Sequence, residues 1–150
     1  MEREKFKLYF VESENKILKI LNEFDNVFNP SLSSLIGDLT RYSQKLYRHA
    51  FVLEVRKDEK VVGFAAIYAN NTVNKTAYLT QIAVNKNVQN KSVGKMLLNA
   101  CISIAVENGM ELLKLEVYNE NLNAINFYKH QGFKFIDDCS GKSKYMIRKL

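Results

Sequence analysis

Cysteine and histidine are scarce in this sequence, and no pair of them stands at a metal-ligand spacing. The two cysteines, Cys101 and Cys139, are far along the chain from His49 and from His130. Metal-binding motifs place such ligands a few residues apart, so no metal site is predicted. Isolated thiols outside a disulfide framework are typical of a reducing compartment, which predicts reduced cysteines and a cytoplasmic protein.

Long apolar runs are absent as well. No run reaches the roughly 18 residues that a membrane-spanning helix needs. The most apolar stretch, residues 96–106, is interrupted by Asn99 and Ser103, which favours a buried core helix. Residues 1–7 alternate charged and aromatic side chains and lack the apolar segment of a signal peptide. No membrane partner is therefore expected.

Proline occurs once, and no stretch rich in glycine, proline or serine separates one part of the chain from another. The sequence also lacks internal repeats. A chain of 150 residues, 47% apolar and 25% charged, suits one globular core. We therefore expect a single domain over residues 1–150.

The formal net charge is +6, which has three explanations. Nucleic-acid binding requires basic residues clustered with aromatic ones, and the lysines here are scattered, so no nucleic-acid partner is expected. A solvated basic surface is the simplest explanation. The third is a polyanionic small ligand, which the local group of Lys86, Lys91 and Lys95 favours.

Apolar periodicity and turn residues predict both helices and strands. Strands are expected over residues 6–10, 50–56, 61–69, 76–84, 112–118, 133–138 and 144–148. Helices are expected over residues 14–25, 32–46, 93–108 and 122–131. The strand–helix–strand unit of residues 76–118 predicts a parallel pair, and the three strands of residues 50–84 predict an antiparallel meander. The fold class is therefore mixed α/β.

The loop between the strand 76–84 and the helix 93–108 carries the first candidate site. A helix N-terminus offers unpaired N–H groups and the positive end of the helix dipole, an arrangement that binds phosphate. Gly94 permits close approach of a ligand, Ser92 offers a hydroxyl, and Lys91 and Lys95 add charge. A plain strand-to-helix connection is the alternative. The segment is neither a P-loop nor the three-glycine dinucleotide motif.

The sequence from Gln89 to Gly94 resembles the pyrophosphate motif of the GNAT superfamily of N-acetyltransferases, with Ser92 where the family usually has glycine. The resemblance implies that acetyl-CoA is the acyl donor. It implies that the pantetheine arm lies along Ile82, Ala83 and Val84, paired with their main chain. It also implies that the pyrophosphate binds to main-chain N–H groups of the following residues: Gln89, Asn90, Lys91, Ser92, Val93, Gly94 and Lys95.

A second segment resembles the other hallmark of this superfamily. The matching positions are Asn121, Ala124, Ile125, Phe127, Tyr128, Gly132 and Phe133. Together the two motifs imply a mixed, mostly antiparallel sheet of six to seven strands flanked by about four helices. The resemblance adds acetyl-CoA contacts at Asn121, Ala124 and Tyr128. For Asn121, a simple N-cap is a compatible alternative.

Aminolysis of a thioester needs a neutral amine and benefits from an acid at the departing thiolate. A phenol is protonated at neutral pH, so Tyr128 suits the acid, with a core aromatic as the alternative. Alternation in the strand 112–118 places Glu116 on the face away from the core. Its spacing to Tyr128 resembles that in ribosomal-protein alanine acetyltransferases, where these positions hold base and acid. A solvated or ion-paired glutamate is the alternative, with a water held by Thr80 or Gln81 as the base.

The acceptor is left open between three hypotheses. The first is the primary amine of a small molecule, and the second is a protein N-terminus or lysine. The third is a non-catalytic acyl-CoA-binding module. Because dimers are common in the superfamily, a homodimer is one alternative for the oligomeric state.

Overall fold

A computed structural model describes residues 5–88, 92–138 and 141–150 of the chain. The α-helices and strands follow the predicted order with one exception, described below. The elements are β1 (Phe6–Phe10), α1 (Glu14–Phe24), η1 (Asp25–Val27), α2 (Leu32–Ile36), α3 (Leu39–His49), β2 (Phe51–Lys57), β3 (Lys60–Tyr68), β4 (Thr76–Val84), η2 (Lys86–Val88), α4 (Val93–Glu107), β5 (Leu112–Tyr118), α5 (Leu122–His130), β6 (Lys134–Asp138) and β7 (Ser143–Lys149).

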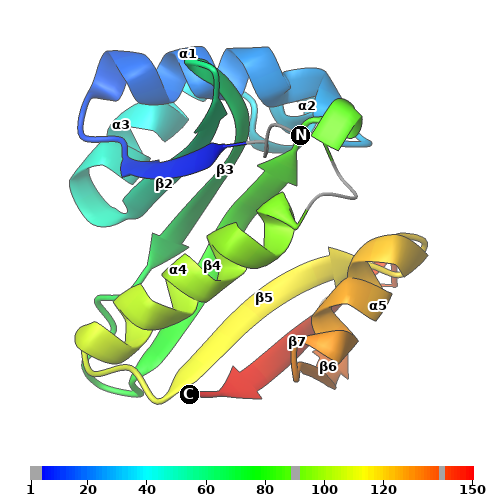
Figure 1. The fold of residues 1–150 in the computed structure, drawn as a ribbon. Helices are drawn as coiled ribbons and strands as arrows, with labels where there is room; N and C mark the ends of the chain where they lie inside the picture. Colours follow the sequence, from blue (N-terminus) through cyan, green and yellow to red (C-terminus); the bar gives the residue numbers. More distant parts are fainter. Residues whose placement is uncertain (1–4, 89–91, 139–140) are drawn as a thin grey trace.

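The strands form one seven-stranded sheet in the order β1-β2-β3-β4-β5-β7-β6. The pair β4–β5 is parallel, and the other neighbouring pairs are antiparallel. The predicted mixed, mostly antiparallel sheet is therefore confirmed. The parallel pair sits in the middle of the sheet, where the chain crosses from the meander to the C-terminal half through α4 (Figure 1).

Helices cover both faces of the sheet. One core cluster joins α4 and α5 to the sheet through residues such as Leu97 and Ile125, and a second joins α1 and α3 through Leu21 and Leu46. Successive strand residues point to opposite faces, so both faces of a central strand are apolar when each is covered. The sheet therefore has an α4–α5 face and an α1–α3 face (Figure 1).

The prediction of a single helical stripe over residues 32–46 was wrong, because two helices share that stretch. Gly37 interrupts them with φ +86°, a left-handed backbone that glycine adopts without strain. Asp38 then begins α3 by accepting hydrogen bonds from the N–H groups of Thr40 at 2.9 Å and Arg41 at 3.3 Å. Three helices therefore precede the meander instead of two.

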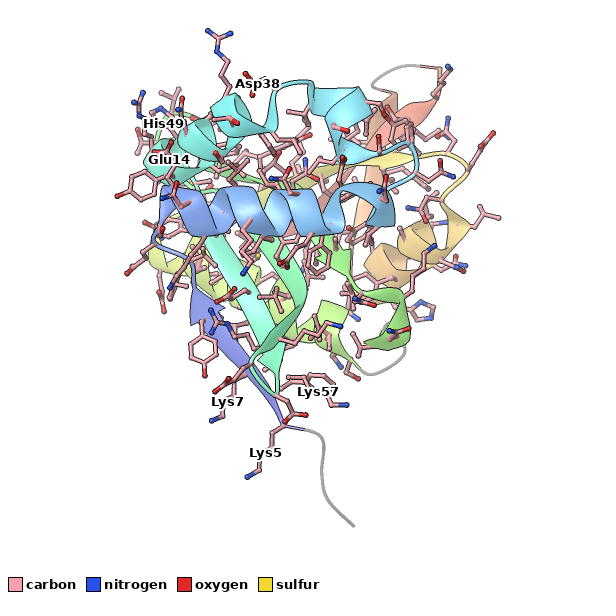
Figure 2. All side chains as sticks on the ribbon, turned by 90° about the horizontal axis from the view of Figure 1, so that it is seen from above. Lys5, Lys7, Glu14, Asp38, His49 and Lys57 are labelled. Carbon is pink, nitrogen blue, oxygen red and sulfur yellow. The ribbon has the colours of Figure 1, made fainter. Side chains whose placement is uncertain are left out.

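Figure 2 shows the α1–α3 face from above, with α1 lying across it and Asp38 and His49 marking the two ends of α3. The two helices pack against each other through apolar stripes. Lys5, Lys7 and Lys57 gather at the far end of β1 and β2 and project outward. These cations are exposed or half-buried at the sheet edge, as expected for part of a solvated basic surface.

Candidate functional site

Strands β4 and β5 part at the place where the two sequence motifs meet. Their parallel ladder contains three residue pairs and ends at Tyr78 and Lys114. Beyond that pair the strands diverge toward their carboxyl ends, as Figure 1 shows. Ile82, Ala83 and Val84 lie in the part of β4 that follows the ladder. An extended ligand that enters between the strands would run alongside these three residues, like an added strand.

Helix α4 begins at this opening. Val93, at its first position, is buried and fixes the helix in the core. Gly94 and Lys95 follow in the first turn, where N–H groups have no partner within the helix. The helix dipole adds partial positive charge at the same end, and the exposed Lys95 adds a full charge. The start of α4 is therefore suited to an anion.

Ser92 carries a strained backbone just before α4. Its φ is 67° and its ψ is 13°, in the left-handed region, which costs a residue with a Cβ roughly 1 kcal/mol. This conformation explains why the motif usually has glycine here, since glycine adopts it without that cost. Gln89, Asn90 and Lys91 lie outside the described residues, so their predicted contacts stay predictions.

Gly94 brings the two motifs into contact. A Cβ added to it would lie 3.6 Å from Cζ of Phe127 and 3.9 Å from Cγ2 of Val84. The start of α4, the end of β4 and the middle of α5 therefore converge on one backbone position. A methyl group makes ordinary contacts there, whereas a longer side chain must displace Phe127 or extend over the N–H groups of the helix.

Tyr128 lies in the core on the α4–α5 face. Its side chain is 7% exposed, and its ring makes edge-to-face contacts with Phe127 at 5.4 Å and Phe133 at 5.6 Å. Burial, and secondarily the nearby Cys101 thiol, raises the pKa of the Tyr128 phenol well above its usual value. Burial also raises the pKa of Cys101, to about 12. Both groups therefore carry their protons at neutral pH, and Tyr128 has a proton to donate.

Glu116 is exposed on β5, as the strand alternation predicted. Its Oε2 accepts a hydrogen bond from the Ser143 hydroxyl at 3.2 Å. Lys114, the cation two residues away, places its Nζ 3.9 Å from the ring centroid of Tyr145. The Glu116 carboxylate is therefore held by β7 while remaining open to solvent.

Glu116 and Tyr128 lie on opposite faces of β5. Leu115 and Val117, the neighbours of Glu116, point into the core cluster that contains Tyr128. Glu116 consequently faces the α1–α3 side. The two side chains can act on one substrate carbon only through the opening between β4 and β5.

Asn121 caps helix α5, as the simpler of its two interpretations predicted. Its Oδ1 accepts a hydrogen bond from the N–H of Ala124 at 3.3 Å. This bond satisfies one of the free donors in the first turn. Both residues lie in that first turn, and the contacts with acetyl-CoA that the resemblance implies for them stay predictions.

A hydrogen-bonded cluster on the α1–α3 side was not predicted from the sequence. Tyr42 of α3 shares a hydrogen bond with Thr80 of β4 at 3.1 Å, and Gln81 donates through Nε2 to the Tyr42 hydroxyl at 3.1 Å. We refer to these three residues as the bulge cluster, because β4 is irregular at this point. Burial raises the pKa of Tyr42, and the hydrogen bonds to Thr80 and Gln81 oppose that shift only in part.

Other kinds of site are not found in the described residues. Within residues 5–88, 92–138 and 141–150, no three histidine, cysteine, aspartate or glutamate side chains form a potential metal site. In the same ranges no helix has the length and apolar character needed to cross a membrane. A surface concavity of about 380 Å³ lies between β1, α3 and β2, and none of the residues predicted for catalysis or for acetyl-CoA binding lines it.

Comparison with known proteins agrees with both motifs. A sequence model of the acetyltransferase (GNAT) family matches residues 15–133. An N-acetyltransferase of Methanocaldococcus jannaschii is 35% identical over 88 residues, which are 56% of this chain and 38% of that protein. The chain thus spans about two fifths of that relative's length. A Bacillus subtilis protein named as a ribosomal protein bS18-alanine N-acetyltransferase is 28% identical over 120 residues, 76% of each chain.

Solved structures share the fold over nearly the whole chain. A Pyrococcus horikoshii protein has a TM-score of 0.80 at 21% identity and covers 97% of this chain and 99% of its own. An N-acetyltransferase of Thermoplasma acidophilum, solved in complex with coenzyme A, has a TM-score of 0.72 at 18% identity, with 96% and 99% covered. At these identities the likeness concerns the fold alone.

Proposed function

Because the chain belongs to the acetyltransferase (GNAT) family, we propose that it transfers an acetyl group from acetyl-CoA to the primary amine of a small molecule. The observation that carries this proposal is the convergence at Gly94. At this position the start of α4, which is suited to an anion, contacts α5, the helix that contains Tyr128. The end of β4, where it diverges from β5, lies at the same place. A thioester ligand needs all three: a strand edge for its arm, N–H groups for its phosphates and an acid at its sulfur.

The donor would bind along β4 and across the start of α4. Ile82, Ala83 and Val84 would flank the pantetheine arm, and the N–H groups of Gly94 and Lys95 would bind the pyrophosphate. The described residues fit this assignment, because the ladder between β4 and β5 has ended before these strand positions. Acetyl-CoA enters as a substrate and leaves as free CoA.

The chemistry is direct attack of a neutral amine on the thioester carbonyl. The nitrogen forms a bond to the carbonyl carbon, and the bond from carbon to sulfur breaks. The amine nitrogen loses its proton through water to Glu116, and the departing thiolate takes a proton from Tyr128. The products are an N-acetyl amine and CoA thiol, so the protons balance once Glu116 and Tyr128 exchange with solvent.

A protein N-terminus is the second candidate acceptor. The spacing of Glu116 and Tyr128 favours it, as does the Bacillus subtilis relative whose name specifies a ribosomal protein alanine. The small-molecule acceptor is supported by the helices of the α1–α3 face. They leave the polar side chains of Thr80 and Gln81 half-buried beside α3, where a small amine could hydrogen-bond to them.

Calorimetric binding tests the proposal at its first step. We expect micromolar binding of acetyl-CoA, and weaker binding of ATP, which has phosphates but no pantetheine arm. Desulfo-CoA retains the arm and serves as the matched comparator. Release of free thiol is then measured with glucosamine, spermidine, L-ornithine and a hexapeptide that begins with alanine. Turnover with the peptide alone would select the second candidate, and failure of acetyl-CoA to bind would overturn the proposal.

Replacing Glu116 by glutamine tests the base. The amide cannot take a proton, so we expect kcat/KM for the amine to fall roughly 10- to 100-fold at neutral pH. The difference should narrow as the pH rises, because more of the amine is then neutral in solution. Glu120→Gln, in the exposed loop that follows β5, is the matched control. Superimposable pH profiles for Glu116→Gln and the parent would place the base elsewhere.

A further inference from the structure

The bulge cluster of Tyr42, Thr80 and Gln81 owes its geometry to one extra residue in β4. Ala66 of β3 pairs with Gln81, and Ile67 pairs with Leu79, which leaves Thr80 without a counterpart. A bulge of this kind turns side chains away from strict alternation.

The packing on either side of the bulge shows its effect. Leu79 and Ile82 both contact the core on the α4–α5 face, although three positions separate them. Thr80 and Gln81, between them, both bond to Tyr42 of α3. Two consecutive residues of β4 therefore present polar groups to the α1–α3 face.

The hydrogen bonds within the bulge cluster determine which of its polar atoms can still accept a hydrogen bond from a substrate. Gln81 uses its Nε2 as the donor to the Tyr42 hydroxyl, so its Oε1 remains as an acceptor held in a set orientation. Tyr42 and Thr80 share one hydrogen bond between two hydroxyls. Gln81 is half-buried, and its Oε1 is consequently an acceptor oriented by the buried Tyr42.

The bulge cluster lies beside the opening where the thioester would sit. Thr80 stands two residues beyond Tyr78 on β4, and Glu116 stands two residues beyond Lys114 on β5; Tyr78 and Lys114 form the last pair of the ladder. Thr80 and Glu116 both face the α1–α3 side. The cluster and Glu116 therefore flank the opening from its two strands.

We propose that Gln81 Oε1 accepts a hydrogen bond from the attacking amine and that Tyr42 is the positioning residue that holds Gln81 in place. This inference rests on the proposed function and identifies the part of the chain that orients the acceptor. The amine's remaining proton leaves toward water and Glu116, because a carboxamide cannot take it.

An uncharged acceptor suits this reaction. A carboxylate beside the amine would favour the charged ammonium form and raise its pKa. A carboxamide also orients the amine nitrogen, but it stabilises the ammonium form less than a carboxylate does because it has no net charge. Residues 78–81 of β4 contain no acidic side chain, so the charged base and the orienting group belong to different strands.

The test compares two tyrosine-to-phenylalanine variants. Tyr42→Phe removes both hydrogen bonds of the cluster. Tyr68→Phe is the matched control, because the buried Tyr68 hydroxyl has no hydrogen-bond partner among the described residues. The acceptor is whichever primary amine turns over fastest in the thiol-release screen. For Tyr42→Phe we expect KM for that amine to rise about tenfold, with the Kd of acetyl-CoA unchanged. Tyr68→Phe should have the same KM for the amine and the same Kd of acetyl-CoA as the parent.

A second variant covers the case in which Tyr42→Phe fails to fold. Gln81→Met keeps the length of the side chain, removes the acceptor oxygen and should raise the same KM about tenfold. If Gln81→Met keeps the parent's KM while the parent acetylates the amine, this inference fails and the proposed function stands. A rise in both KM and the Kd of acetyl-CoA, with a lowered Tm, would reduce the cluster to a structural role. If the parent acetylates no amine, both proposals are overturned.

Discussion

Replacing Gly94 by glutamate is expected to weaken acetyl-CoA binding at least 100-fold and to leave the domain folded. A Cβ at this position already contacts Phe127 and Val84, so the longer side chain must extend over the first N–H groups of α4. There its carboxylate would occupy the space of the pyrophosphate and repel it. At neutral pH the effect combines steric exclusion with charge repulsion in a partly desolvated place.

The fold should tolerate Gly94→Glu, so a loss of acetyl-CoA affinity could be separated from a loss of stability. Gly94 is the second residue of α4, and a negative charge in the first turn interacts favourably with the helix dipole. Glutamate also has a higher helix propensity than glycine. Loss of affinity in calorimetry would thus come with an unchanged or higher Tm.

Gly94→Ala is the matched control. Its methyl group would meet Phe127 at an ordinary contact distance of 3.6 Å. We expect acetyl-CoA affinity within about threefold of the parent and a gain in stability of up to about 1 kcal/mol from helix propensity. Equal affinity for the glutamate variant and the parent would remove the start of α4 from the binding site.

The two strands on either side of the opening were predictable from the sequence, because the polar turn residues and the apolar pattern indicate the same bounds for each strand. The segments 76–84 and 112–118 match β4 and β5, since polar turn residues bound apolar alternation in each. The parallel pairing of β4 and β5 followed from the helix between them. These features are local or depend on one connection, so a single sequence carries them.

The break between α2 and α3 was not predictable from periodicity alone. Leu32, Leu35, Ile36 and Leu39 continue at helical spacing across Gly37. An isolated glycine is tolerated in many helices, and its backbone conformation depends on where the neighbouring segments pack. The N-cap preference of Asp38 was the available signal, because aspartate at a helix start accepts the N–H bonds seen here.

The bulge in β4 left only an incomplete signal in the sequence. Ala77 and Leu79 follow one alternation, and Ile82 and Val84 follow the other, but Ala83 continues the first. Both faces of this strand are covered, so the apolar residues alone do not show where an extra residue is inserted. Its partner Tyr42 is 38 residues from Thr80, so only the folded chain brings them together.

The relation between Glu116 and Tyr128 is likewise a property of the tertiary structure. Their spacing along the chain suggested a pair of groups, and strand alternation correctly placed Glu116 away from the core. The packing of α5 then put Tyr128 on the opposite face of β5. The sequence could therefore point to both residues as candidates, but it could not show that they lie on opposite faces of β5.

Replacing Tyr128 by phenylalanine is expected to lower kcat at least 100-fold without weakening acetyl-CoA binding. The hydroxyl would donate its proton only as the bond from carbon to sulfur breaks, so its loss affects the transition state and not the bound donor. The ring remains, and with it the contacts with Phe127 and Phe133. A drop in kcat with an unchanged Kd in calorimetry identifies this pattern.

The pH profile provides a second check on Tyr128. Burial raises the pKa of this phenol, so the acid stays protonated at pH 10, where an exposed tyrosine is about half ionised. The parent's rate should accordingly rise with pH as the amine becomes neutral, with no decline that depends on Tyr128 below pH 10. Tyr9→Phe, on the exposed edge strand β1, controls for the loss of a hydroxyl elsewhere. Equal kcat for Tyr128→Phe and the parent would assign the proton of the departing thiolate to water.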